Sequence, residues 1–286
     1  MAVKRYAVFT MDVEAFSDTE CVAKSKENIE ADLLDGFDTY LEILNRHAIK
    51  STLFTVGSLA PKMTDRLQSA IRHGHRLALH SLHHVAPLEQ SVETFKEETK
   101  QAKEHLAALF DTEVVGFRAP CFSMDDARLN VLQELGFKYD SSHLNFPAAR
   151  HTVKLHLHEF KECVKGIFRR NDFYEFALSG TKIFGLPYPI SGGGYIRLCH
   201  WGVAKYVIRH YLERNEYYVF YVHPFELTSQ KIPFIKDLKL YDKYYIKAGI
   251  KNYAAHIEQL ILMLKQMNYR FITFEELQEE LTAQPT

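Results

Sequence analysis

Two short motifs carry residue types that bind metal ions and move protons. The first is DVE at residues 12–14, where two carboxylates lie one residue apart directly after an apolar run. One carboxylate of such a pair can bind a cation while the other stays free as a base. A helix N-cap or a solvated loop explains this motif alone about equally well.

The second motif is HSLHH at residues 80–84, which holds three histidines. Histidines four apart lie on one face of a helical turn, a spacing that chelates zinc. Neutral imidazole also suits Co, Ni or Fe. One carboxylate and two histidines leave open positions for water, as a catalytic metal site requires. The pair is His80 with His84, or with His83 as an alternative, and a His-rich surface turn is the competing interpretation.

Two further polar residues follow apolar runs. Arg118, in GFRAP, can pair with a carboxylate and keep it ionised, although a surface salt bridge is the usual role of such an Arg. His223, in VHPFE, can donate a proton to a leaving group, although a lone His after a strand is more often structural. SGGGY at residues 191–195 lacks the Lys of a phosphate loop and predicts a tight turn near a ligand.

The elements that position these residues alternate between strand and helix patterns, which indicates a parallel α/β architecture. The predicted strands are residues 6–11, 51–56, 76–79, 114–117, 138–140, 217–222 and 270–273. The predicted helices are residues 28–47, 61–74, 92–110, 123–136, 201–214 and 251–267, the fourth opened by a capping box of Ser123 and Asp126. Because the carboxyl ends of parallel strands meet on one face, we expect the polar residues to converge there.

Residues 143–190 interrupt this alternation and predict extra strands or a lid within a single domain, 1–286. Their basic residues are expected to influence the choice of substrate; these are Arg150, Arg169, Arg170 and Lys182. His151, His156 and His158 fit a half-exposed strand as well as a second metal.

Composition narrows the class of protein. The 286 residues include 35 basic and 36 acidic side chains, so nucleic-acid binding is not expected. The four cysteines, Cys21, Cys121, Cys163 and Cys199, are scattered without a CxxC pair, which argues against a disulfide framework. No signal peptide or transmembrane stretch is evident, and we expect a cytoplasmic protein, with the inner face of the membrane as an alternative location.

Taken in order, the motifs resemble the polysaccharide deacetylase family, also called NodB homology or carbohydrate esterase 4. TMDVE follows the first strand, HSLHH corresponds to the family's H-S/T-x-x-H, FRAP to its R-x-P, and FYVHP to its late histidine. The correspondence runs from about residue 6 to 226. The flanking STLFTVG and PISGGGYIRL are similar to the branch found with bacterial surface-polysaccharide genes.

The resemblance implies a distorted (β/α)7-type, NodB-like barrel and one divalent metal, with Zn first and Co, Ni, Fe or Mn as alternatives. The family's common first motif is T-F-D-D, whose second Asp is a ligand. Here Val13 stands at that position, and by analogy with D-x-E branches Glu14 takes the metal with His80 and His84.

The resemblance also assigns the catalytic roles. Asp12 would be the base, Arg118 would orient it, and His223 would be the acid. The backbone N–H of Cys121, which follows Pro120, would help to bind the oxyanion.

The implied reaction removes an N-acetyl or N-formyl group from an amino sugar. Without a secretion signal, the expected substrate is a nucleotide-linked or lipid-linked intermediate of surface glycan (lipopolysaccharide or capsule) synthesis. The alternatives are a metal-independent hydrolase of a non-sugar amide or ureide, and a non-catalytic carbohydrate-binding relative. The sequence does not predict an oligomeric state.

Overall fold

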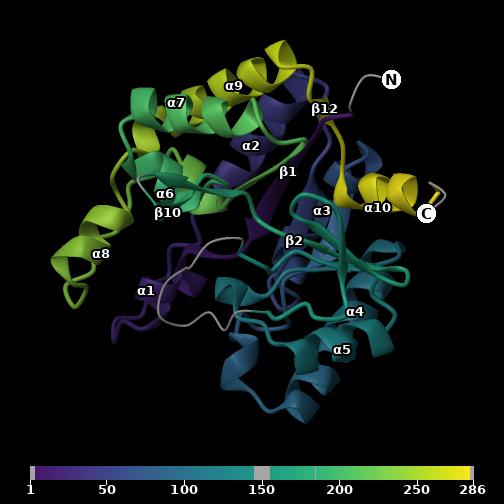
Figure 1. Ribbon diagram of the computed structural model, residues 1–286. Coiled ribbons are helices and arrows are strands. Elements are labelled where there is room, and N and C mark those ends of the chain that lie inside the picture. The colour runs from purple at the N-terminus through teal and green to yellow at the C-terminus, as the bar shows by residue number, and fades with distance from the viewer. Residues whose placement is uncertain (1–3, 145–154, 184, 284–286) are drawn as a thin grey trace.

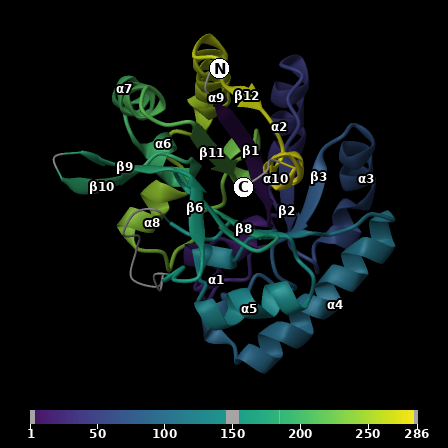
Figure 2. The same cartoon turned by 45° about the vertical axis from the view of Figure 1, so that its right-hand side comes forward.

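The computed structural model describes residues 4–144, 155–183 and 185–283. Within these ranges one ten-stranded sheet has the order β11-β1-β2-β3-β4-β5-β8-β7-β6, with β12 also paired to β1. Pairs from β11 to β8 are parallel, and those from β8 to β6 are antiparallel. The sheet is curled and open, and Figures 1 and 2 show helices along its outside. This confirms the α/β prediction.

The strand bounds agree closely with the apolar runs. The strands are β1 Tyr6–Val13, β2 Thr52–Thr55, β3 Arg76–Leu79, β4 Gly116–Phe117, β5 Tyr139–Asp140, β6 Lys161–Val164, β7 Ile167–Arg170, β8 Phe173–Phe176, β11 Tyr217–Val222 and β12 Arg270–Phe271. All residues of β1 and β11 are buried, because both faces of these parallel strands are covered.

One strand end differs from the prediction in a way that matters for the site. The first strand does not end at Asp12; β1 continues to Val13, and Asp12 pairs with Phe54 of β2 in the register. A carboxylate is tolerated inside this strand because Arg118 pairs with it. Glu14 is therefore the first residue beyond β1.

The helices pack around the sheet. They are α1 Glu20–Ala23, α2 Asp35–Arg46, α3 Thr64–Arg72, α4 Val92–Phe110, α5 Asp126–Glu134, α6 Gly193–Leu198, α7 Trp201–Leu212, α8 Leu240–Tyr245, α9 Ile250–Gln266 and α10 Phe274–Thr282. The bounds of α4 are those predicted, because Ser91 caps its first turn and Asp111, in a left-handed conformation, ends it. No helix among the described residues is long and apolar enough to cross a membrane.

Two helix starts were predicted wrongly. The helix expected from residue 28 begins at Asp35, because Leu33 has a positive φ of 51° and packs into a separate small cluster. The cap of α5 is Asp125 and not Ser123, since the Asp125 carboxylate accepts the Arg128 N–H. The helix predicted for residues 61–74 begins with a 3-10 turn, Ala60–Met63, and continues as α3.

The segment that interrupts the alternation contributes strands. β6, β7 and β8 extend the main sheet, and β9 (Gly180–Ile183) pairs with β10 (Leu186–Pro189) in a separate hairpin. Arg150 and His151 lie outside the described residues.

Candidate active site

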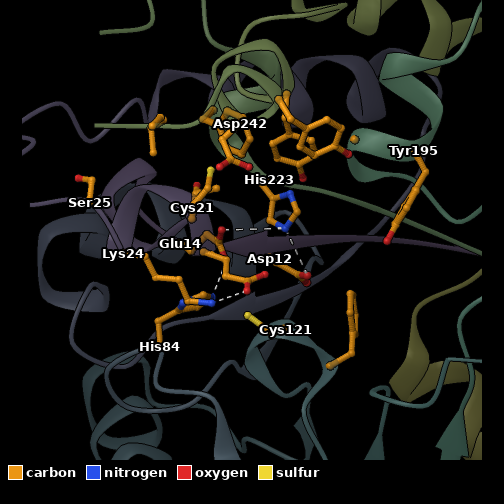
Figure 3. Close-up of a pocket in the computed structure, with 18 of the residues that line it drawn as sticks. Asp12, Glu14, Cys21, Lys24, Ser25, His84, Cys121, Tyr195, His223 and Asp242 are labelled. Carbon is orange, nitrogen blue, oxygen red and sulfur yellow. Dashed lines mark hydrogen bonds and ion pairs between the residues drawn. The ribbon is translucent and has the colours of Figure 1, made fainter. Parts of the chain in front are cut away.

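The predicted polar residues converge on a cavity of about 990 Å³ at the carboxyl end of the parallel strands. Asp12, Glu14, His80, His84 and His223 all line it. Asp12 lies in β1 and Glu14 directly after it, His80 and His84 follow β3, and His223 follows β11. In the sheet β11 is next to β1, and β2 lies between β1 and β3. Figure 3 shows Asp12, Glu14, His84 and His223 facing one another across its floor.

Glu14, His80 and His84 form a set with the chemistry of a metal site. Their possible ligand atoms all lie within 4.8 Å of one another. Glu14 Oε2 is 2.7 Å from His84 Nε2 and 3.6 Å from His80 Nε2. His80 Nδ1 hydrogen bonds to the backbone carbonyl of Arg118 at 2.8 Å, which leaves Nε2 directed at the cluster. One carboxylate and two imidazoles suit zinc, which binds such atoms at about 2.0–2.2 Å.

The two histidines meet in a different way from the one expected. Residues 80–84 form a turn and not a helix, with positive φ at Ser81 (63°) and at His84 (57°). The Ser81 hydroxyl accepts the His84 N–H at 2.9 Å and holds this turn. His83 is exposed, so His84 is the member that joins the cluster.

The cluster is strongly coupled by charge. Burial by itself raises the pKa of Glu14, but attraction to His84 and His223 and hydrogen bonds from His80 and His84 hold it well below its usual range. Burial lowers the pKa of His223, yet the charges of Glu14 and Glu226 raise it to about 9. The imidazoles of His84 and His223 therefore favour the ionised form of Glu14, which is the form that binds a cation.

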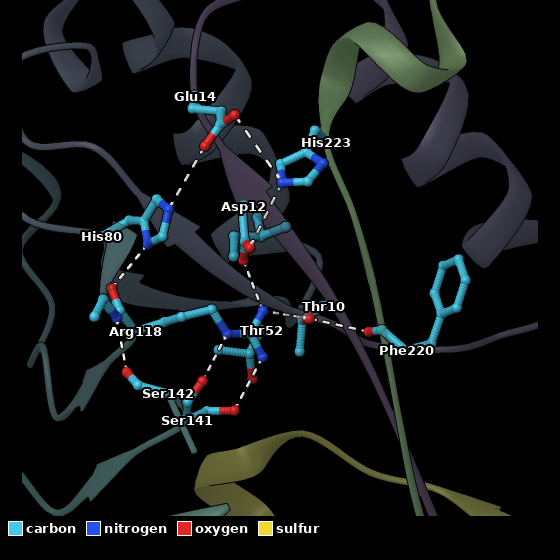
Figure 4. Close-up of polar contacts among 12 residues, drawn as sticks. Thr10, Asp12, Glu14, Thr52, His80, Arg118, Ser141, Ser142, Phe220 and His223 are labelled. Atoms are coloured by element: carbon cyan, nitrogen blue, oxygen red, sulfur yellow. Dashed lines mark hydrogen bonds and ion pairs between the residues drawn. The ribbon is translucent and has the colours of Figure 1, made fainter. Parts of the chain in front are cut away.

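Asp12 lies beside this cluster and is held from one side. Its Oδ1 accepts a hydrogen bond from Arg118 Nη1 at 2.6 Å, and the same nitrogen donates to Thr10 Oγ1 at 2.9 Å. Its Oδ2 lies 4.0 Å from His223 Nε2. One carboxylate oxygen is thus fixed by Arg118, while the other faces the histidine at the cavity floor (Figure 4).

Arg118 is itself fixed from several directions. It is fully buried, stacks over Phe54 with its guanidinium carbon 4.1 Å from the ring centroid, and donates from Nε and Nη2 to the carbonyl and hydroxyl of Ser141 at 3.0 Å each. The Ser141 hydroxyl in turn donates to the carbonyl of Phe176. A guanidinium with this many partners cannot turn away from Asp12 without breaking several hydrogen bonds.

A buried acid pair supports this network and was missed at the sequence level. The Ser142 hydroxyl donates to Asp140 at 2.8 Å, and Glu175 accepts the backbone N–H groups of Ser142 and His143. Burial and the charge of Asp140 raise the pKa of Glu175 well above its usual range, which favours its protonated form. Ser141 and Ser142 follow the predicted strand 138–140, but nothing in the sequence pairs them with Glu175 of β8.

His223 also has a partner that the sequence did not reveal. Its Nδ1 lies 3.0 Å from Glu226 Oε2, and Glu226 Oε1 accepts from Arg197 Nε at 2.9 Å. Glu226 and Arg197 are buried. In the sequence, the acid three residues after His223 could have indicated Glu226 as its partner. Arg197 comes from a different element, α6. Asp12 and His223 are thus each backed by a buried Arg, directly for Asp12 and through Glu226 for His223.

The remaining predicted residues lie at the cavity wall or behind it. Pro120 is buried at the start of a 3-10 turn, and Cys121 lines the cavity with a left-handed backbone (φ 55°). Burial raises the pKa of the Cys121 thiol to about 12, which opposes thiolate chemistry. Gly192 turns the chain against β11, where an added Cβ would lie 1.9 Å from the Tyr221 carbonyl oxygen.

The outer wall differs from expectation. Arg169, Arg170 and Lys182 do not line the cavity. Its outer part is instead formed by the α1 region and by residues around α8, namely Lys24, Lys26, Lys239, Tyr241 and Tyr245, with Tyr195 from α6. His156 and His158 stack on each other outside it, and among the described residues only Glu14, His80 and His84 group as three potential metal ligands.

Comparisons with known proteins agree with this fold and these motifs. Residues 32–139 match the family model of polysaccharide deacetylases, and residues 151–279 match a domain of unknown function, DUF3473. No curated protein matches the chain by sequence. The two model matches cover separate parts of the chain.

Solved structures match over nearly the whole chain. A Mycobacterium smegmatis protein assigned to the polysaccharide deacetylases is 17% identical with a TM-score of 0.64, covering 99% of this chain and 92% of its own. A carbohydrate esterase 4 domain of a xylanase from the hindgut metagenome of Trinervitermes trinervoides is 14% identical with a TM-score of 0.53, covering 99% and 93%. A carbohydrate esterase 4 pseudoenzyme from Bacillus anthracis is 13% identical with a TM-score of 0.57, covering 97% and 66%.

These likenesses confirm the NodB-like distorted barrel. The family model relates residues 32–139 to the polysaccharide deacetylases, and the solved structures show the fold. Because a pseudoenzyme shares the fold, the activity has to be argued from the site.

Proposed function

We propose that this protein is a metal-dependent carbohydrate N-deacetylase with a single catalytic domain. The observation that carries the proposal is the contiguity of three groups on one cavity floor: the ligand set of Glu14, His80 and His84, the partly free carboxylate of Asp12, and the imidazole of His223. Glu14 Oε1 and Asp12 Oδ2 each lie 4.0 Å from His223 Nε2, so the three groups face the same small volume.

The metal would be held by Glu14, His80 and His84, where a bound divalent ion would polarise the amide carbonyl and make its water more acidic. Asp12 would take a proton from the attacking water; Arg118 holds one of its carboxylate oxygens and leaves the other available for this role. The oxygen of the water adds to the amide carbonyl carbon. The backbone N–H of Cys121 is proposed to stabilise the oxyanion.

His223 completes the reaction as the acid. Glu226 accepts the Nδ1 proton, so Nε2 is the nitrogen that can deliver a proton toward Asp12 and Glu14. Protonation of the amide nitrogen accompanies cleavage of its bond to the carbonyl carbon, which releases acetate or formate and an amine. A binding module requires neither a buried Arg behind Asp12 nor the Glu226–Arg197 pair behind His223, and this favours an enzyme over a non-catalytic relative.

For the substrate we propose an N-acetylated or N-formylated amino sugar linked to a nucleotide or a lipid, at the cytoplasmic face of a membrane. Tyr195, Tyr241 and Tyr245 line the cavity outside the catalytic floor, as suits a sugar ring. Lys26 and Lys239 in the same wall suit a phosphate-containing carrier. A role in surface glycan synthesis follows as a proposal from this substrate class.

The test is release of acetate or formate from a panel of free, nucleotide-linked and lipid-linked N-acylated sugars, with and without a chelator. We expect activity that the chelator removes and that added Zn²⁺ restores. Activity that survives complete metal removal, above all on a ureide, would favour the metal-independent alternative. Sugar binding without product from any substrate would favour the non-catalytic alternative.

A further inference from the structure

The segment of residues 231–251, called here the lysine-rich lobe, has a charge unlike that of the rest of the chain. It contains six lysines and two aspartates, a net charge of +4, whereas the whole chain has a net charge of -1. Its helix α8 projects from the edge of the molecule on the side of α1 (Figure 1). Basic charge gathered in one segment of the chain indicates an anionic partner.

The lobe divides its apolar side chains between inside and outside. Its inward residues pack in a small core with Val22 and Phe225; they are Ile232, Ile235, Leu238 and Ile246. Its outward residues are among the most exposed large apolar side chains of the described chain; they are Phe234 (68% exposed), Leu240 (86%), Tyr241 (69%) and Tyr244 (60%). Because the inward set already anchors the lobe, folding does not require the outward set, and a cluster of this kind marks an interaction surface.

Two lysines lie over the ring of Phe234, one of the outward aromatic residues. The ammonium groups of Lys243 and Lys247 lie 5.1 and 5.6 Å from the ring centroid of Phe234. Lysine beside Phe, Leu and Tyr on a projecting element is the composition of peptide segments that lie in the headgroup layer of a bilayer. There the apolar tips enter the acyl boundary while the lysines meet the phosphates.

The lobe also forms part of the cavity mouth. Leu238, Lys239 and Tyr241 line the cavity, and Lys24 and Lys26 of the α1 region line it as well. A surface that binds the outer side of the lobe would therefore lie next to the cavity mouth. A sugar attached to a lipid carrier would be presented at the same level.

We propose that the lysine-rich lobe docks this protein onto an anionic phospholipid bilayer with the cavity mouth at the headgroup layer. The choice of a lipid-linked substrate that follows rests on the proposed function, whereas the docking itself does not. The observations favour a bilayer over an acidic polysaccharide because Phe234, Leu240 and Tyr244 project into solvent and do not line the cavity. They disfavour a second copy, because a symmetric contact would bring two lobes of charge +4 together.

The test is co-sedimentation of the full chain with vesicles of phosphatidylcholine alone or mixed with phosphatidylglycerol, at low and high salt. The apolar variant is Phe234→Ser/Leu240→Ser/Tyr244→Ser, and its matched control is Val203→Ser/Tyr206→Ser on α7, where both residues are also exposed. The charge variant is Lys231→Gln/Lys247→Gln, with Lys62→Gln/Lys100→Gln as its control. Tyr241 and Lys239 stay unchanged because they line the cavity.

We expect the wild type and both controls to bind only the anionic vesicles, less so at high salt. The charge variant should bind about 30-fold more weakly, since each lysine near such a surface contributes a factor of about five. Both lobe variants should keep the wild-type turnover of a water-soluble N-acetyl sugar. If the wild type bound anionic vesicles but did not turn over any N-acetyl sugar, the proposed function would be rejected and the docking would not.

Three results would overturn the docking. One is wild-type protein that does not sediment with anionic vesicles, and another is lobe variants that sediment as well as their controls. The third is lobe-dependent binding to an acidic polysaccharide, or lobe-dependent dimers in light scattering, without vesicle binding. Circular dichroism of each variant checks that it is folded.

Discussion

The cavity floor and the lysine-rich lobe differ in how far their side chains are buried and in how firmly they are held. On the floor, Asp12 is 2% exposed and Arg118 and Glu226 are fully buried, and each is held by charged hydrogen bonds. In the lobe, no residue of α8 is buried and Leu240 is 86% exposed. The floor is a preorganised electrostatic environment, which proton transfer requires. The lobe can change without disturbing that environment, so partner and carrier choice can vary independently of the chemistry.

The largest expected effect comes from the floor residue closest to the proposed proton transfer. Asp12→Asn keeps the hydrogen bond from Arg118 but cannot take a proton, so kcat should fall by about 10³-fold or more. Metal content, measured by mass spectrometry, should remain at the wild-type level. Turnover near that of the wild type would show that Asp12 is not the base, and Asp126→Asn, on α5 outside the cavity, is the matched control.

Removal of a proposed ligand should follow in size. His84→Ala should lose bound Zn²⁺ on dialysis and more than about 100-fold of its activity, because the site would keep only one imidazole. His83→Ala is the matched control, since His83 is the exposed neighbour of the same turn. If both variants retained metal equally, the ligand set would be wrong.

The buried support of His223 should matter less than the groups that react. Glu226→Gln leaves a neutral partner at His223 Nδ1 and at Arg197, and kcat should fall by about 10- to 100-fold, the range typical of an orienting partner. Glu213→Gln, on the surface after α7, serves as the control. A variant with unchanged kcat would reduce the Glu226–Arg197 pair to a structural role.

The smallest effect on activity is expected for Glu175, which forms a buried acid pair with Asp140 behind the cavity floor. Burial raises the pKa of Asp140 to about 6 and that of Glu175 further, so their contribution to stability is complete at low pH and lost as pH rises through these values. Glu175→Gln imitates the protonated acid and should change kcat by less than about threefold. Its urea-unfolding free energy should fall less steeply than that of the wild type above about pH 6. Parallel pH profiles would contradict the raised pKa of Glu175.

Prediction from sequence succeeded where periodicity and burial agree. The bounds of β3, β11 and α4 are those predicted, because each has a long apolar pattern with clear ends. It failed at the start of α2, because Leu33 packs into a separate small cluster. It also failed at the turn of residues 80–84, because no sequence pattern revealed its residues with positive φ. The strands β9 and β10 and the helices α6, α8 and α10 were not predicted either, since each of them is short.

The sequence by itself determined which residues gather at the candidate site, because Asp, Glu, His and Arg placed at the ends of buried parallel strands must meet at one edge of the sheet. It also determined the fold class through the alternation of strand and helix. Only the tertiary structure decided how those residues are held: Glu175 behind Ser142, Arg197 behind Glu226, and the lobe beside the cavity mouth. The hydrogen bond between Arg197 and Glu226 joins residues 29 positions apart, and that between Ser142 and Glu175 joins residues 33 positions apart. Local sequence patterns carry no information about partners at that range.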